Sequence, residues 1–346
     1  MRTYDATMAR SEITIDLSAL RANVERLVIV ADGAEVWAVV KADGYGHGAL
    51  DCGRAALDAG ARALCVATIG EALPLRSALP DTRILVLGPT APADVPTARE
   101  ACLELVVGEE IPEGVPVHVK LDTGMGRWGI SELATPDRNV VGVMTHLATA
   151  DSDPAFARRQ VGRFAELTAP YPHLARHVAN SAAALRLPES RFDAVRCGIA
   201  LYGLSPFGTD PADDGLAPVL AWRSELASVK RLEVGDSTGY GRRFVAAEPT
   251  WIGVVPVGYA DGFRRDLTGT TVLVGDDCCP VIGTISMDAI AVQLPATRSL
   301  GTTITLIGPG VPLEAHARVA ETITYELATR IESGPTRATR RVVGTS

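Results

Sequence analysis

The sequence predicts an α/β protein in which a compact (β/α)8 TIM-like barrel is followed by a mostly antiparallel β domain. Two features of the chain support this prediction. From Glu35 to Ile199, short apolar runs alternate with helical stretches, as in a barrel of parallel strands. After about residue 220, strands alternate with Gly/Asp turns, as in antiparallel sheets. We therefore expect the barrel at residues 11–220 and the β domain at residues 221–346.

Eight runs supply the expected barrel strands. Most are almost continuously apolar, which is typical of strands that are buried on both faces. Eight parallel strands with helices between them are the number that closes such a barrel. The runs lie at residues 36–42, 63–68, 83–88, 103–107, 115–121, 140–146, 177–180 and 194–199.

Amphipathic stretches supply the expected helices. Residues 18–31 carry one apolar face, and similar patterns occur at residues 70–79 and 153–167. The apolar face of the first helix is formed by Leu20, Val24, Leu27 and Val28. These helices would cover the outside of the barrel.

One connection is too short for a helix. Only residues 108–114 separate the fourth and fifth runs, whereas a parallel crossover usually needs about a dozen residues or more. Either a helix has been trimmed to a loop at this point, or the fourth strand lies elsewhere.

The sequence pattern of the second half of the chain predicts a different kind of domain. Several short strands separated by turns lie between residues 221 and 309, and one further helix is expected at residues 313–331. The polar tail after residue 331 is expected to be loose.

Composition excludes several classes of protein. The net charge is −8 without a long run of like charge, which argues against binding to nucleic acid or to an anionic membrane. The N-terminus lacks the apolar region of a signal peptide, and no stretch has the length and apolarity of a membrane span. The six cysteines show no CxxC spacing, so we expect reduced thiols, no metal site and a cytoplasmic protein. Cys278 and Cys279 are best explained as small strand residues.

Polar residues gather where the predicted strands end, at the rim on which barrels carry their functional groups. Alone, each has an ordinary explanation: a strand-end Lys or Arg can extend to solvent, a His can be structural, and Asn180-Ser181 can begin a helix. Five strands that bring polar groups to one rim indicate a site instead. The residues are Lys41, Lys120, Arg127, His146, Asn180, Ser181, Arg196, Gly198 and Ile199.

This set of residues is suited to pyridoxal 5′-phosphate (PLP). A lysine at the mouth of an apolar barrel loses solvation, which lowers its pKa and frees its amine to form a Schiff base. Ser181 at a helix start and the backbone N–H groups of Gly198 and Ile199 can hold a phosphate. Arg196 and His146 can then flank a planar ring.

The motifs around these residues resemble those of alanine racemase, a fold-type III PLP enzyme. The stretch "AVVKADGYGHGA" at residues 38–49 resembles the family's PLP-lysine motif, and further matches follow in order from about Glu12 to Glu326. They are "KLDTGMGRWG", "MTHLATAD", "HVANSAAAL", "VRCGIALYGLSP", "GYG" at residues 239–241, "VPVGYADGFRR", "GTISMDAI" and "ITYE". No single motif would suffice, but the ordered set covers most of the chain.

The resemblance implies a role for each matched residue. Lys41 would anchor PLP and act as one catalytic base, and Tyr240 would be the opposing base. Arg196 would meet the pyridine nitrogen, and His146 would lie against the ring. The phosphate would be held by Tyr45, Ser181, Gly198, Ile199 and Tyr325.

Further matched residues concern the substrate. Arg127 would contact the cofactor phenolate and the substrate carboxylate, and Lys120, which is carbamylated in many members, would orient it. Tyr259 and Met287 would line the substrate entry, with Asp288 beside them as structural support. In this family the β domain of one subunit completes the barrel site of the other, which implies a homodimer with shared active sites.

Racemisation is consistent with these residue types. PLP supplies the electron sink that removal of an amino acid's α-proton requires, and bases on both faces of the α-carbon allow either enantiomer to form. A lysine and a tyrosine on opposite sides meet this requirement. The implied activity is the conversion of L-alanine to D-alanine for peptidoglycan, with a broader-range racemase that also takes serine as the alternative.

Other classes fit the sequence less well. A decarboxylase of the same fold type would carry its own glycine-rich phosphate loops and a cysteine-bearing motif in the second domain, neither of which we find. A PLP carrier protein would lack the second domain, and a structural protein would not need so many matched rim residues. The sequence leaves the carbamylation of Lys120 and the role of His47 open.

Some segments depart from the family pattern. Residues 131–139 and 108–114 are shorter than usual, "STGYGRRF" replaces the usual context of Tyr240, and the C-terminus differs. We expect these departures to affect helices on the outside of the barrel, and so stability and dimer geometry, more than the rim residues.

Overall fold

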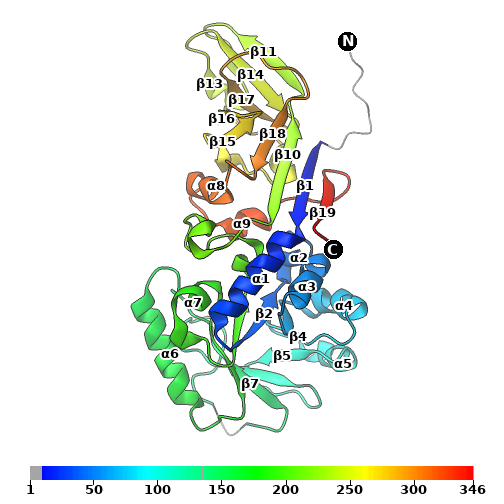
Figure 1. The fold of residues 1–346 in the computed structure, drawn as a ribbon, viewed down its shortest axis with the longest axis vertical. Coiled ribbons are helices and arrows are strands. Elements are labelled where there is room, and N and C mark those ends of the chain that lie inside the picture. Colours follow the sequence, from blue (N-terminus) through cyan, green and yellow to red (C-terminus); the bar gives the residue numbers. More distant parts are fainter. Residues whose placement is uncertain (1–9, 134–135, 346) are drawn as a thin grey trace. The chain divides into compact units, whose positions relative to one another are not determined.

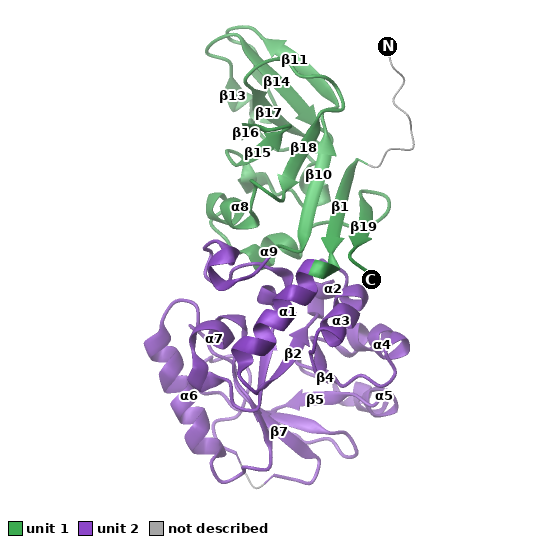
Figure 2. Ribbon diagram, viewed as in Figure 1, with its two compact units in different colours: residues 1–18, 218–346 green, residues 19–217 purple. Residues whose placement is uncertain are grey.

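The computed structural model describes residues 10–133 and 136–345, which form two compact units. One unit comprises residues 19–217, and the other contains the chain from residue 218 onward together with the described residues up to Ser18 (Figure 2). Within the described residues, no helix is both long enough and apolar enough to cross a membrane.

The first unit is a closed barrel of eight parallel strands, which confirms the predicted fold class (Figure 1). Each strand pairs in parallel with the next, and the last pairs with the first. The strands are β2 (Glu35–Val39), β3 (Ala63–Val66), β4 (Ile84–Val86), β5 (Glu104–Val107), β6 (Val117–Lys120), β7 (Val140–Met144), β8 (Ala175–His177) and β9 (Ala194–Cys197).

The apolar runs form strands because both faces of the barrel wall are buried. All four side chains of β3 and all three of β4 are fully buried. The largest shift in position concerns the seventh strand, which occupies residues 175–177 instead of the predicted 177–180. It ends early because Asn180 caps the following helix, and its side chain accepts a hydrogen bond from the backbone N–H of Ala183 at 3.0 Å.

Helices cover the outside of the barrel. The three predicted helices appear as α1, α4 and α6, and shorter ones lie between other strands (Figure 1). Their bounds are α1 (Leu17–Ala31), α2 (Lys41–Tyr45), α3 (Ala49–Asp58), α4 (Ile69–Ala78), α5 (Val95–Glu100), α6 (Pro154–Thr168) and α7 (Ser181–Arg186).

The apolar face of α1 differs from the prediction at one residue. Leu20, Val24 and Leu27 are buried, but Val28 is 39% exposed, and Ala31 is buried in its place. The helical period explains this, because positions 20, 24, 27 and 31 fall on one stripe and position 28 lies on its edge.

The short fourth connection is a trimmed crossover. No helix lies between β5 and β6, yet these strands pair in parallel from Leu105 to Val107, so the fourth strand was placed correctly. The described residues between β6 and β7 also contain no helix; residues 134–135 of the short segment 131–139 lie outside the described chain.

The second unit is built on a nine-stranded sheet in the order β11-β14-β17-β16-β15-β18-β10-β1-β19. Its pairs are antiparallel except for β1 with β19, which agrees with a mostly antiparallel domain. The bounds are β1 (Ser11–Asp16), β10 (Leu220–Glu225), β11 (Ser228–Leu232), β14 (Thr250–Val255), β15 (Thr271–Val274), β16 (Asp277–Ile282), β17 (Ile290–Leu294), β18 (Thr303–Ile307) and β19 (Thr339–Val343), with a separate hairpin β12 (Ser237–Thr238) and β13 (Phe244–Val245).

The first and the last strand of the described chain both join this sheet. Residues 11–16, which we assigned to the barrel domain, form β1 and pair with β10. The polar tail, expected to be loose, is instead ordered as β19 at Thr339–Val343, because β1 offers it a parallel edge with Glu12 opposite Thr339. Cys278 and Cys279 are free thiols within β16, and the other four cysteines are also free.

The helix expected at residues 313–331 is divided into α8 (Leu313–Val319) and α9 (Thr324–Ala328). Glu321 lies in the left-handed region with φ 49°, which ends the first helix. The β-branched run Thr322-Ile323-Thr324 follows it and disfavours an uninterrupted helix.

Candidate active site

Lys41 begins a strained left-handed turn directly after β2. The strand itself ends at Val39, so Lys41 lies two residues beyond it and is the first residue of α2. Gly44, Gly46 and Gly48 have positive φ, as expected for a glycine-rich turn, but so do Ala42, Asp43 and Tyr45, at 51°, 49° and 53°. Non-glycine residues adopt this region at a cost and persist there only where the surroundings hold them.

Glu71 holds this turn in place, although it is not among the predicted site residues. One carboxylate oxygen accepts the backbone N–H of Ala42 at 2.8 Å, and the other accepts those of Ala67 and Thr68 at 2.7 and 3.3 Å. Glu71 thereby joins the turn after β2 to the loop after β3. The signal in the sequence was the capping box at Thr68-Ile69-Gly70-Glu71, which also begins α4.

The electrostatic surroundings of Lys41 favour its neutral amine. Burial lowers the pKa of Lys41, and the nearby cations Arg127 and Arg196 lower it further. Glu71 has the opposite effect but does not outweigh them. A neutral amine is the nucleophilic and basic form of a lysine side chain.

Lys120 and Arg127 share one aromatic ring. The ammonium of Lys120, at the end of β6, lies 5.2 Å from the centroid of Trp128, and the guanidinium of Arg127 lies 4.9 Å from it. Burial, followed by Arg127 and Arg196, lowers the pKa of Lys120 to about 8. Trp128 belongs to this part of the site and was missed, because an exposed tryptophan in a glycine-rich loop carries no specific signal.

Arg196 is buried in β9 with its guanidinium tied to the ends of the two preceding strands. Its Nη1 donates to the carbonyl oxygen of His177 at 2.7 Å and to Nδ1 of the same residue at 2.9 Å. Its Nη2 donates to the carbonyl oxygen of Thr145 at 2.9 Å. Burial lowers the pKa of Arg196 to about 10, which leaves it charged at neutral pH.

His146 is held neutral beside Arg196. Its Nδ1 lies 3.5 Å from Nη2 of Arg196, and its carbonyl oxygen accepts from the Gln160 amide at 3.3 Å. Burial, followed by Arg196 and Lys120, lowers the pKa of His146 to about 3. The ring is therefore an uncharged flat surface at this rim.

Tyr45, Ser181 and Gly198 meet at one point of the rim. The hydroxyl of Ser181 accepts the backbone N–H groups of Gly198 at 3.0 Å and Ala200 at 3.3 Å. A side chain at Gly198 would place its Cβ 2.5 Å from the hydroxyl oxygen of Tyr45, so only glycine permits this contact. The predicted donor Ile199 is buried here, but Ala200, which the sequence analysis did not select, directs its N–H to Ser181.

The second unit carries the remaining predicted residues. Tyr240 is 74% exposed, and its carbonyl oxygen accepts from the hydroxyl of Thr284 at 2.7 Å. The backbone N–H of Tyr259 donates to the Ser286 carbonyl at 3.0 Å, next to Met287. The loop at residues 283–288 therefore joins the segments of Tyr240, Tyr259 and Met287 within this unit.

Asp288 lies in an ion-pair cluster that supports this loop. Its carboxylate contacts Arg10 at 3.1 Å and Arg337 at 3.0 Å, and these hydrogen bonds hold its pKa below the usual range. Arg337 also contacts the buried carboxylate of Asp261 at 3.0 Å. Asp261 in turn accepts the backbone N–H of Gly258, which precedes Tyr259.

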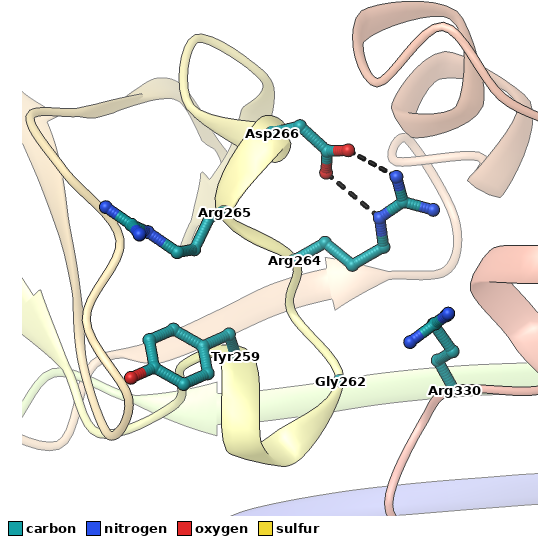
Figure 3. A pocket seen from close by; sticks show the side chains of 6 residues that line it. All are labelled: Tyr259, Gly262, Arg264, Arg265, Asp266 and Arg330. Carbon is teal, nitrogen blue, oxygen red and sulfur yellow. Dashed lines mark hydrogen bonds and ion pairs between the residues drawn. The ribbon is translucent and has the colours of Figure 1, made fainter.

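A pocket of about 470 Å³ lies in the second unit beside Tyr259 (Figure 3). Arg264 is paired with Asp266 and Glu326, and Arg330 also contacts Glu326. Tyr325 lies in α9 next to Glu326 and is half-buried. The lining residues are Tyr259, Gly262, Arg264, Arg265, Asp266 and Arg330.

Comparison with known proteins assigns the family. A model described as the alanine racemase N-terminal domain matches residues 15–206, and one described as the C-terminal domain matches residues 219–340. The chain belongs to the alanine racemase family. An alanine racemase of Levilactobacillus brevis is 40% identical, with 92% of this chain and 94% of that protein covered. One from Beutenbergia cavernae is 42% identical over the same shares of the two chains.

Solved alanine racemase structures share the whole architecture. The enzyme from the D-cycloserine producing Streptomyces lavendulae matches with a TM-score of 0.90 at 34% identity, with 98% of each chain covered. The enzyme from Bacillus anthracis, solved with bound L-Ala-P, matches with a TM-score of 0.86 at 33% identity. The trimmed connections of this alanine racemase family member therefore leave the fold intact.

We predict that Glu71→Gln destabilises the protein by about 1–3 kcal/mol, because the amide would turn donor hydrogens toward backbone N–H donors and leave a donor unsatisfied. Thermal melting would measure this loss. The matched control is Glu100→Gln, since Glu100 is an exposed residue of α5. Equal melting temperatures for the two variants would contradict the role of Glu71 in holding the turn.

Proposed function

We propose that this chain interconverts L- and D-alanine with PLP, and so supplies D-alanine for cell-wall peptidoglycan in the cytoplasm. The observation that carries the proposal is the match of both alanine racemase domain models in a chain whose matched lysine, Lys41, is desolvated at the barrel rim. The alternative, a racemase that prefers serine or a wider range of amino acids, has no specific support in the relatives.

The rim fits PLP on three points. The N–H groups of Gly198 and Ala200 converge on the Ser181 hydroxyl, beside Tyr45, in a cradle suited to a phosphate. Lys41 carries a lowered pKa, as a covalent anchor requires. Arg196, which remains charged at neutral pH, would offer a donor to the ring nitrogen. When bound, PLP would supply the electron sink for loss of the α-proton.

Two residues would move the α-proton. Lys41 in its neutral form would take or return it on one face of the α-carbon, and the Tyr240 phenol would do so on the other. A neighbouring cation or hydrogen bond would assist the Tyr240 phenol as a base. Two bases on opposite faces allow a proton to leave as one enantiomer and return as the other.

The remaining rim residues would orient the reacting groups. Arg127 would bind the substrate carboxylate and the cofactor phenolate, and Lys120 would keep it in place. Because Lys120 has a pKa of about 8, part of its population is a neutral amine that can combine with CO2 to form a carbamate and a proton. Arg196 can donate a hydrogen bond but would not give up its proton, so a ring nitrogen facing it would stay unprotonated and side reactions would be limited.

Substrate entry would be set by the second unit. Tyr259 and Met287 would line the entry, with Asp288 as support, and Tyr325 would add a phosphate ligand. A bulky gate made by Tyr259 and Tyr325 would favour a small side chain, which supports alanine over larger amino acids. Tyr240, at 74% exposed in the single chain, would act in the site of a partner, so the active form would be a homodimer.

The first prediction concerns the cofactor anchor. The purified protein should show a visible absorbance band that borohydride bleaches, because reduction fixes PLP on Lys41 as a stable amine. Lys41→Ala should lose the band. A Lys41→Ala protein that keeps a band that borohydride bleaches would contradict the assignment of Lys41 as the cofactor anchor.

The second prediction concerns the opposing base. Tyr240→Phe should slow exchange of the α-proton with D2O more for one enantiomer of alanine than for the other, because only one face loses its base. Proton NMR of each enantiomer in D2O measures both rates. Equal residual exchange from both enantiomers would argue against a two-base mechanism.

The third prediction concerns the shared site. Mixing inactive Lys41→Ala and Tyr240→Phe subunits should restore some racemisation, since a mixed dimer contains one site with both bases. Each variant incubated alone is the control. No recovery, despite subunit exchange shown by differential tags, would mean that each site is built within one chain.

A further inference from the structure

A chain of hydrogen-bonded side chains runs through the barrel below Arg196. The Nδ1 atom of His177 lies 2.9 Å from Nη1 of Arg196, and Nε2 of His177 lies 2.8 Å from Nδ1 of His118. Nε2 of His118 lies 2.9 Å from Oε2 of Glu104. Glu104 is the first residue of β5 and Arg196 the third of β9, so the chain rises from the strand starts toward the functional rim.

The chemistry of its two ends fixes the direction of every bond in this chain. Arginine only donates, so Nδ1 of His177 must accept and its proton must lie on Nε2. Because His177 donates this proton to Nδ1 of His118, that nitrogen must accept. His118 therefore also carries its own proton on Nε2 and donates it to Glu104, which only accepts. Arg83 Nη2 lies 3.5 Å from the same His118 nitrogen, farther than the carboxylate.

The surrounding packing is built for these two rings. The ring of Trp37 lies tilted against His177, with 4.5 Å between the ring centroids, and edge-on to His118 at 5.7 Å. Gly142 in β7 leaves room for His118, because a Cβ there would lie 2.1 Å from its Nδ1. Both histidines are fully buried.

Glu104, the acidic end of this hydrogen-bond chain, is held in place where the barrel strands begin. Arg83 contacts both oxygens of Glu104 at 2.7 and 2.9 Å. Burial raises the pKa of Glu104, but the hydrogen bonds from His118 and Arg83 together outweigh it, and the net pKa is lowered. Glu35 lies at the same end of the barrel, where it accepts from the Trp37 indole N–H at 2.8 Å and forms an ion pair with Arg83 at 3.8 Å, but it is not a link of the hydrogen-bond chain.

We propose that Glu104 is a positioning residue for the active site: through His118 and His177 it fixes the direction of the hydrogen bonds that hold the Arg196 guanidinium at the rim. This inference rests on the proposed role of Arg196 against the PLP ring nitrogen. Both histidines have pKa values lowered mainly by burial, as neutral links require. The hydrogen-bond chain thereby links the Arg196 guanidinium to the Glu104 carboxylate, although the two groups are not in contact.

The direction of the hydrogen bonds through His118 and His177 is tested by NMR of the whole protein. In the whole protein labelled with ¹⁵N-histidine, long-range ¹H–¹⁵N spectra should show His118 and His177 as neutral rings with the proton on Nε2 from pH 6 to 8. Signals are assigned by His118→Asn and His177→Asn. An imidazolium, or a proton on Nδ1 of either ring, would overturn the proposed direction.

The positioning role is tested by PLP affinity. Glu104→Leu should weaken PLP binding in equilibrium dialysis about tenfold, a loss like that of an outer-shell partner of a metal ligand. Glu104→Gln, whose amide oxygen can still accept from His118, should recover most of that affinity. The matched control Glu35→Leu removes a carboxylate at the same end of the barrel and an Arg83 contact but should leave PLP affinity unchanged.

The outcomes separate this inference from the proposed function. If the unaltered protein binds no PLP, the proposed function fails, while the histidine spectra still test the chain. If it binds PLP and racemises alanine, but Glu104→Leu equals Glu35→Leu in affinity, the positioning role is overturned and the proposed function stands. Should Glu104→Leu not fold, a Glu104→Gln protein with altered histidine tautomers but unchanged PLP affinity would overturn the role equally.

Discussion

The buried guanidinium of Arg196 is the constraint on which the barrel rim depends. A cation with five N–H donors and no acceptor must find acceptors when it leaves water, or the burial is very costly. The chain supplies them from the ends of β7 and β8, where the carbonyl oxygens of Thr145 and His177 turn toward it. These contacts hold the last residue of β8 and the residue that precedes His146.

A second constraint is the left-handed turn that begins at Lys41. Ala42, Asp43 and Tyr45 adopt positive φ angles, which costs free energy that contacts with the surroundings must offset. Glu71 contributes from the neighbouring loop, and Asp43 accepts the backbone N–H of Ala49 at 2.8 Å. The turn places Lys41 where burial and two arginines depress its pKa, so strain and electrostatics act on the same residue.

The trimmed connections show which parts of the barrel can vary. The links after β5 and β6 lack a helix in the described residues, but the strands that they join keep their parallel pairing. Lys120 ends β6 and Arg127 lies in the loop beyond, so the loss of outer helices does not remove either residue. Strand pairing through backbone hydrogen bonds, rather than the helical cover, sets the positions of these side chains.

Local pattern in the sequence determined the eight strands, the change to an antiparallel unit, the family and the rim positions of Lys41, Ser181 and Arg196. Such features can be predicted from the sequence because strand burial and strand ends are properties of short segments. The partners that hold them were decided only by tertiary structure. The contacts of Glu71 and Ala200 and the hydrogen bonds from Glu104 to Arg196 depend on which strands lie side by side. The pairing of β19 with β1 joins the first and last described strands. Apart from the capping box that contains Glu71, no local signal encodes contacts between residues so far apart, because these contacts arise only when the barrel and the sheet have closed.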